Sequence, residues 1–170
     1  MDGLNVFNYI SHISDETVDQ TDAADGAVGY LDRWAGQGNA AYEDAAQFLI
    51  GNLESFGLEV ITQRFTYDSL MTGAQNPEAY NICGYRFGEI NPDKWMVFGA
   101  HFDIAPPING GLVSPHLPGV GRTYGTRVGA YDNTAGTAMV LTVSEAMANF
   151  NTRNTMVFCL WSGEEVGKRG

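Results

Sequence analysis

The chain has 170 residues, 44% of them apolar, and its 20 acidic side chains against nine Lys and Arg give a formal net charge of −11. This size allows one domain with a buried core, and the charge excludes nucleic acid as a favoured partner, because phosphates would be repelled over most of the surface. The sequence has no window of roughly 18 uncharged apolar residues that could span a membrane, and its start lacks the profile of a secretory signal. We therefore expect a soluble chain, either cytoplasmic or secreted after processing.

Residues 1–40 are rich in Asp, Gly and Asn, and we expect them to form a loosely ordered N-terminal arm. Within this arm, the apolar stretch from Val6 to Ile13 has the length of one or two helical turns. Arg33 and Trp34 are expected to pack there rather than to cap a pocket. Residues 41–170 are predicted to form a second unit.

The second unit begins with a predicted helix over residues 41–56, which ends at Gly57. A glycine directly after the last apolar position is a common helix stop. One face of the helix is apolar, because large or small apolar residues recur at spacings of three and four, namely Ala45, Phe48, Leu49, Leu53 and Phe56.

Three predicted strands follow, at residues 58–67, 80–87 and 95–98. The first two have a polar connection that suits antiparallel pairing. The third, Trp95–Phe98, is a continuous apolar run, which is typical of a strand buried on both faces.

The last elements predict a parallel crossover. A Gly- and Pro-rich loop over residues 105–129 leads to a predicted helix at about 133–150 and then to a second continuous apolar run at 156–161. Strand, helix and strand in this order indicate an α/β fold, here a three-layer sandwich with a mixed, mostly parallel central sheet. A buried strand needs neighbours on both sides, and this one comes just before Gly170, so we expect the fold to be truncated.

Cys83 and Cys159 are the only cysteines of the sequence, and each lies in an apolar, strand-like run. Such positions favour buried core thiols, with a disulfide or a reactive thiol as the alternative. Two isolated cysteines cannot form a Cys-rich zinc site.

Three clusters of acidic or imidazole side chains adjoin the predicted strands and helix. The clusters are His101-Phe102-Asp103 after the first continuous run, Asp132-Asn133 at the start of the helix, and Gly163-Glu164-Glu165 after the second run. In an open α/β sheet, the carboxyl ends of parallel strands and the N-termini of the following helices share one edge, where ligands bind. The three clusters are therefore predicted to converge.

Convergence of these residue types points to zinc, because imidazole and carboxylates are its ligands and a catalytic zinc has three of them plus an open position for water. His101, Asp132 and one of the two glutamates make such a set, and the other glutamate can act as general base. Asp103 can accept the second imidazole N–H and fix its tautomer. Taken singly, the clusters have simpler interpretations, as a surface pair, a helix N-cap and a solvated turn, so the hypothesis depends on their joint placement.

The clusters, extended to residues 129–136 and 163–167, resemble the signature segments of the double-zinc exopeptidase family that includes bacterial leucyl aminopeptidases and glutamate carboxypeptidase. The resemblance covers about residues 41–170, the N-terminal part of the family's catalytic domain, and implies a zinc-peptidase (phosphorylase/hydrolase-like) fold and a metal-dependent exopeptidase, foremost an aminopeptidase, acting on peptides.

The resemblance also implies roles for individual residues. His101 would ligate one zinc, Asp132 would bridge two zincs, and Glu165 would complete the ligands of the first. Glu164 would be the general base, and Asp103 would orient the imidazole.

The sequence departs from the family in two respects. Tyr131 stands where relatives often have an acidic residue. The Asp and His that hold the second zinc in the family would come after Gly170, so one set of ligands is present, and a missing C-terminal half or a partner chain is expected to supply the other. His12 and His116 are poor substitutes. The isolated chain should therefore show weak or no turnover.

The loop over residues 106–125 is expected to line the substrate entrance or to be a plain connection. Two other functions stay open. One is a glutaminyl cyclase-like enzyme of the same fold with a single zinc, and the other is a non-catalytic, peptidase-like binding module.

Overall fold

The computed structural model describes residues 3–14, 30, 33–36, 39–67, 78–105 and 129–170. Along the chain these form α1 (Gly3–Ser14), α2 (Ala40–Ser55), β1 (Glu59–Thr66), β2 (Glu78–Arg86), β3 (Asn91–His101), the short segment η1 (Ala130–Ala135), α3 (Gly136–Met147) and β4 (Asn154–Trp161). The predicted entrance loop at 106–125, with His116, lies outside the described residues. No helix in the described part is long and apolar enough to cross a membrane.

The four strands form one mixed sheet in the order β1-β2-β4-β3. β1 pairs with β2 and β2 with β4 in antiparallel fashion, whereas β3 and β4 are parallel. This confirms the predicted antiparallel pair and the predicted parallel crossover through a helix. The α/β class is confirmed as well.

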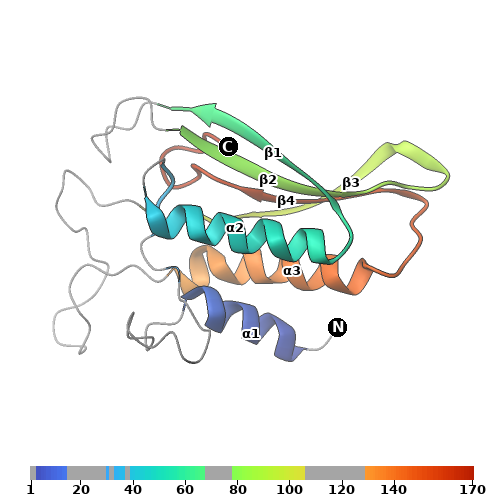
Figure 1. Ribbon diagram of the computed structural model, residues 1–170, viewed down its shortest axis with the longest axis horizontal. Helices are drawn as coiled ribbons and strands as arrows, with labels where there is room; N and C mark the ends of the chain where they lie inside the picture. Colours follow the sequence, from blue (N-terminus) through green and yellow to red (C-terminus); the bar gives the residue numbers. More distant parts are fainter. Residues whose placement is uncertain (1–2, 15–29, 31–32, 37–38, 68–77, 106–128) are drawn as a thin grey trace.

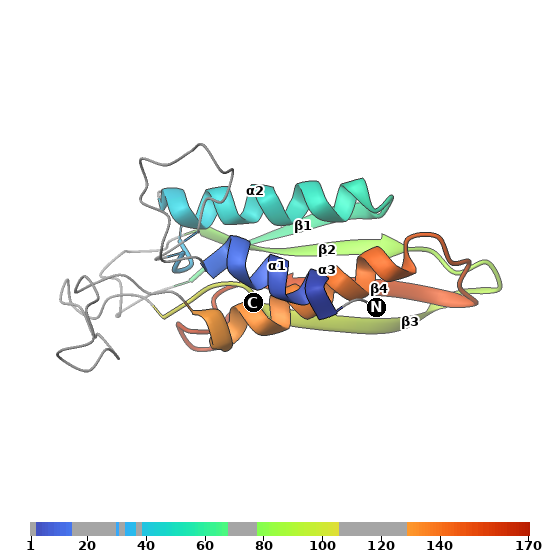
Figure 2. The same cartoon turned by 90° about the horizontal axis from the view of Figure 1, so that it is seen from below.

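The described helices all lie on one face of the sheet (Figures 1 and 2). α2 packs on β1 and β2, α3 packs on β3 and β4, and α1 lies outside α3. The predicted apolar face of α2 is confirmed, because Ala45, Leu49 and Leu53 are buried, and the helix ends before Gly57 with its φ of 75°. The second helical layer of a three-layer sandwich is not among the described residues.

The run Trp95–Phe98 is not buried on both faces as predicted. The exposed fractions of its side chains range from 40% at Phe98 to 60% at Trp95. β3 is an edge strand, and in the described part helices cover one face of the sheet. Side chains alternate between the two faces along a strand. Trp95 and Val97 therefore lie on the face that the described helices do not cover. The expectation that the strand at residues 156–161 lacks a neighbour is wrong, because β4 is flanked by β2 and β3.

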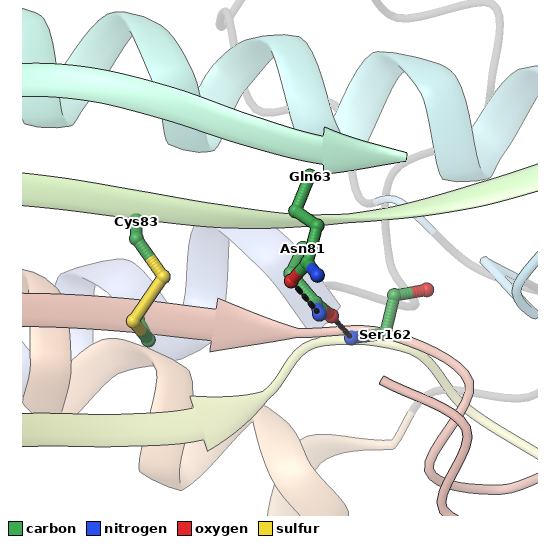
Figure 3. The surroundings of a disulfide bond; sticks show 5 residues. Gln63, Asn81, Cys83 and Ser162 are labelled. Atoms are coloured by element: carbon green, nitrogen blue, oxygen red, sulfur yellow. Dashed lines mark hydrogen bonds between the residues drawn. A yellow bond between two sulfur atoms is a disulfide. The ribbon is translucent and has the colours of Figure 1, made fainter. Parts of the chain in front are cut away.

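Cys83 and Cys159 form a disulfide (Figure 3), so the prediction of two buried thiols is wrong. The two residues are register partners on β2 and β4, with their Cα atoms 4.2 Å apart. Side chains directly opposite on one face of an antiparallel pair come close enough to bond. The periodicity of each strand carried no sign of this, since it does not reveal that residues 76 apart in the sequence become neighbours.

The apolar stretch of the N-terminal arm forms α1, which has 12 residues and is longer than the expected one or two turns. Asn5 and Tyr9 donate hydrogen bonds of 3.2 and 3.3 Å to the carboxylate of Glu145 in α3. His12 stacks on Phe48 of α2 with ring centroids 4.4 Å apart. α1 is therefore tied to the helical layer, while the unit boundary at residue 40 stays a prediction.

Candidate metal centre

The carboxyl ends of the parallel strands β3 and β4 carry two of the predicted clusters, and η1 brings the third beside them. His101 is the last residue of β3 and lies opposite Trp161, the last residue of β4. The Phe102 N–H donates to the Trp161 carbonyl over 2.9 Å, and the Thr137 hydroxyl of α3 donates to the His101 carbonyl over 3.1 Å. The strand ends and the start of the helix are thus joined around the imidazole.

Carboxylates flank both nitrogens of His101. Nε2 lies 3.1 Å from Oδ1 of Asp132 and 3.9 Å from Oε2 of Glu164. Nδ1 lies 3.5 Å from Oδ1 of Asp103 and 3.2 Å from its backbone oxygen. Ligand atoms of His101, Glu164 and Glu165 all lie within 4.8 Å of one another. One imidazole and two carboxylates at this spacing suit a zinc ion, so the donor set fits the metal that the sequence predicts.

Asp132 lies in η1 with a side chain that is 70% exposed, and its carboxylate faces the imidazole. Asp132 and Asn133 depart from helical backbone angles, and the peptide bond between them is cis. The side chain of Asn133, rather than that of Asp132, accepts the Gly136 N–H at the start of α3, over 3.0 Å. The helix-capping alternative therefore applies to Asn133, and the carboxylate of Asp132 stays available to the candidate metal centre.

Asp103 is fully buried and connects two of the clusters. Its two carboxylate oxygens accept the backbone N–H groups of Glu164 and Glu165, each over 3.4 Å. Besides lying beside the imidazole, Asp103 thus anchors the turn that carries both glutamates. Sequence patterns do not reveal this second contact, because it depends on the path of the turn after β4.

The start of that turn is held by polar side chains that the sequence analysis did not single out. The Ser162 N–H donates to Oδ1 of Asn81 over 3.0 Å, and Asn81 donates to Gln63 over 3.3 Å (Figure 3). The Ser162 hydroxyl lies 2.9 Å from the hydroxyl of Tyr42. A signal was present, because an asparagine inside the apolar strand run 79–83 needs a partner once it is buried.

A cavity of about 300 Å³ opens at this edge of the sheet. A side chain at Gly99 is excluded, because its Cβ would lie 2.2 Å from the ring of Trp161. The cavity is also lined by Ala100, His101, Asn133, Trp161, Ser162, Glu164, Lys168 and Gly170.

The electrostatics of the site favour a bound cation. Burial lowers the pKa of His101, but Asp103, followed by Glu164, outweighs this and raises the pKa to about 9. Burial raises the pKa of Glu165, and the nearby charge of Asp132 raises it further. Carboxylates crowded around one imidazole repel one another, and a divalent cation among them would relieve that repulsion.

Known proteins are similar to this chain in sequence and in fold. Residues 81–170 match the sequence profile of Peptidase family M28, whereas the curated proteins give no match. Among solved structures, a leucine aminopeptidase precursor from Bacteroides thetaiotaomicron is 18% identical with a TM-score of 0.70, over 98% of this chain and 49% of that one. A glutaminyl cyclase from Fimbriiglobus ruber is 18% identical with a TM-score of 0.69, over 97% and 46%.

A Zn-dependent exopeptidase from Parabacteroides distasonis is similar too, with 19% identity and a TM-score of 0.65, over 97% of this chain and 46% of that one. At these identities the likeness shows a shared fold, and the chain spans about half the length of the solved chains it matches. The profile match covers more than half of the chain and includes all three clusters. The chain therefore belongs to peptidase family M28.

Proposed function

We propose that this chain provides one half of the active site of a zinc-dependent exopeptidase, foremost an aminopeptidase, which hydrolyses the terminal bond of a peptide. The observation that carries the proposal is the gathering of ligand atoms from His101, Glu164 and Glu165 within 4.8 Å at the ends of two parallel strands. Membership of a peptidase family supports the reaction class.

In this proposal His101, Asp132 and Glu165 would hold the metal. Glu165 belongs to the group of ligand atoms around His101, and Asp132 lies 3.1 Å from its Nε2. Zinc bound there would polarise the scissile carbonyl and lower the pKa of the attacking water. Glu164, which lines the cavity with a side chain that is 35% exposed, would act as the general base, taking a proton from the attacking water and returning it to the leaving amine. Asp103 holds the imidazole through Nδ1, so that Nε2 stays directed at the cavity.

We further propose that a segment beyond these 170 residues, or a partner chain, completes a two-zinc site. This segment would supply the second set of ligands and cover the open face of the sheet. The proposal is supported by the apolar side chains exposed there, among them Trp95, Val97 and Ile61, since large exposed apolar patches mark contact surfaces. It is also supported by the span of the chain, about half of each similar solved structure.

A glutaminyl cyclase is the second candidate. Solved glutaminyl cyclases from Fimbriiglobus ruber and Porphyromonas gingivalis match the fold with TM-scores of 0.69. Such an enzyme would need a single zinc, so the one set of ligands here could suffice. A non-catalytic binding module is less favoured, because His101, Asp132, Glu164 and Glu165 are all retained.

We also propose that the protein is secreted. Because disulfides persist mainly in oxidising environments, the Cys83–Cys159 bond favours secretion after processing over a cytoplasmic location.

Two substrates distinguish the candidate enzymes. The full-length protein is expected to release nitroaniline from leucyl-p-nitroanilide in a zinc-dependent manner and to leave an N-terminal glutaminyl peptide uncyclised, as followed by absorbance and mass spectrometry. The isolated 170-residue chain should give little turnover, because it would lack the second set of ligands of the proposed two-zinc site. Cyclisation without hydrolysis would favour the second candidate, and family-typical hydrolysis by the isolated chain would contradict a divided site.

A further inference from the structure

Arg33 is a buried cation beneath the candidate metal centre. It belongs to residues 1–40, which are predicted to form a loosely ordered arm in which Arg33 packs, and it is only 1% exposed. Burying a charged group is costly unless it is paired and hydrogen-bonded. The hydrogen-bond partners of Arg33 and the charges near it must therefore offset the cost of its burial.

The guanidinium group joins the two segments that carry candidate ligands. Nε donates to the backbone oxygen of Phe102 over 2.8 Å, and Nη2 donates to the hydroxyl of Thr134 over 2.6 Å. Phe102 lies between His101 and Asp103, and Thr134 lies two residues after Asp132. One side chain thus spans the distance between the end of β3 and η1.

Further contacts hold the guanidinium itself in place. Nη1 donates to the backbone oxygen of Tyr30 over 3.1 Å, and the Thr134 hydroxyl donates in turn to the Gly129 carbonyl over 2.7 Å. Gly129 passes so close that a Cβ there would lie 3.1 Å from Nη2 and 2.4 Å from Ile104. Three donors pointing in different directions from one plane are a property of arginine that lysine lacks.

The negative charge of Asp103 acts on Arg33. Burial lowers the pKa of Arg33 to about 10, and the negative charge of Asp103 opposes that shift, so the guanidinium stays charged at neutral pH. Asp103 is itself fully buried and accepts the N–H groups of Glu164 and Glu165. Through Asp103, Arg33 is linked to the third cluster as well.

We propose that Arg33 is a positioning residue of the metal centre, which fixes the segments of His101 and Asp132 relative to each other and balances the buried charge of Asp103. The proposal deepens the proposed function and rests on it. Arg33 acts through the backbone of Phe102 and through Thr134, without touching metal or substrate. The N-terminal segment is therefore part of the site's framework.

The test compares Arg33→Met with Arg86→Met in the full-length protein. Arg86 also donates to a backbone oxygen, that of Phe56 over 3.1 Å, but it pairs with Met156 at the opposite end of β4 from the site. The zinc dissociation constant is measured by competition with a chromophoric chelator. Arg33→Met is expected to weaken zinc binding about 10- to 100-fold, as loss of outer-shell partners does, whereas Arg86→Met should leave it unchanged.

Hydrogen exchange of the metal-free protein gives a second readout that needs no zinc. The amides of Phe102 and Thr134, which donate to Trp161 and Gly129, should lose about tenfold more protection in Arg33→Met than the amides of the β1–β2 ladder. If wild-type protein binds no zinc, the proposed function fails, yet this comparison still decides whether Arg33 fixes the two segments.

Unchanged zinc affinity and unchanged protection at both amides in folded Arg33→Met would overturn the proposal. If Arg33→Met does not fold, Thr134→Val serves instead, because it removes the hydroxyl that Arg33 contacts and keeps the side-chain shape. A loss of zinc affinity in Thr134→Val supports the proposal, and wild-type affinity together with wild-type protection at Phe102 overturns it.

Discussion

Replacing both Cys83 and Cys159 by alanine should lower the free energy of unfolding by roughly 4 kcal/mol. The disulfide joins residues 76 apart in sequence, and a crosslink across so long a loop greatly reduces the conformational freedom of the unfolded chain. The measurement is urea unfolding of the variant and of the unreduced wild type. Wild-type protein treated with a reductant is the control and should lose stability by a similar amount.

The same variant should keep its affinity for zinc while it is folded. Ser162, which leads into the turn with both glutamates, is held by Asn81 and Tyr42 rather than by the disulfide. A loss of stability below about 1 kcal/mol would mean that the crosslink adds little to what the β2–β4 pairing already provides.

In the proposed complete enzyme, Glu164→Gln is expected to lower kcat at least about a hundredfold, because an amide cannot accept the proton of the attacking water. The change preserves the shape of the side chain, so zinc content and KM should change little. Glu54→Gln is the control, since Glu54 is exposed on α2 and its replacement should leave kcat unchanged. Steady-state kinetics and metal analysis of the same samples measure both effects.

Adding Glu165→Gln to these measurements tests which of the two glutamates is the zinc ligand and which is the general base. Both offer an oxygen within the group of ligand atoms around His101. If Glu164→Gln loses zinc and Glu165→Gln keeps it, the roles of ligand and base are exchanged. Full activity of Glu164→Gln with bound zinc would contradict a general base at this position.

Local patterns were sufficient for most of the secondary structure. The helical spacing before Gly57 predicted α2, and the two continuous apolar runs with the helix between them predicted β3 and β4 as parallel strands. This works because periodicity reflects which face of an element is buried. The convergence of the three clusters followed from the same topology, since the ends of parallel strands meet at one edge; the roles of His101, Asp132 and Glu165 stay predictions.

Such local patterns do not predict contacts between segments that are distant in the sequence. The disulfide depends on β4 lying next to β2, and the exposure of Trp95 depends on β3 being an edge strand. The hydrogen bonds of Arg33 and Asp103 depend on how irregular segments pass each other at the site. Hydrophobic periodicity holds no information about irregular segments, so these features emerge only in three dimensions.

Metal analysis of the purified, dialysed chain tests the metal centre most directly. Wild type is compared with the double variant His101→Ala, Glu165→Ala and with a control, His12→Ala, Glu54→Ala, which changes the same residue types on α1 and α2. About one zinc per chain is expected in the wild type and in the control, and none above background in the double variant. Zinc retained by the double variant, or absent from folded wild-type protein, would contradict a metal centre built on His101 and Glu165.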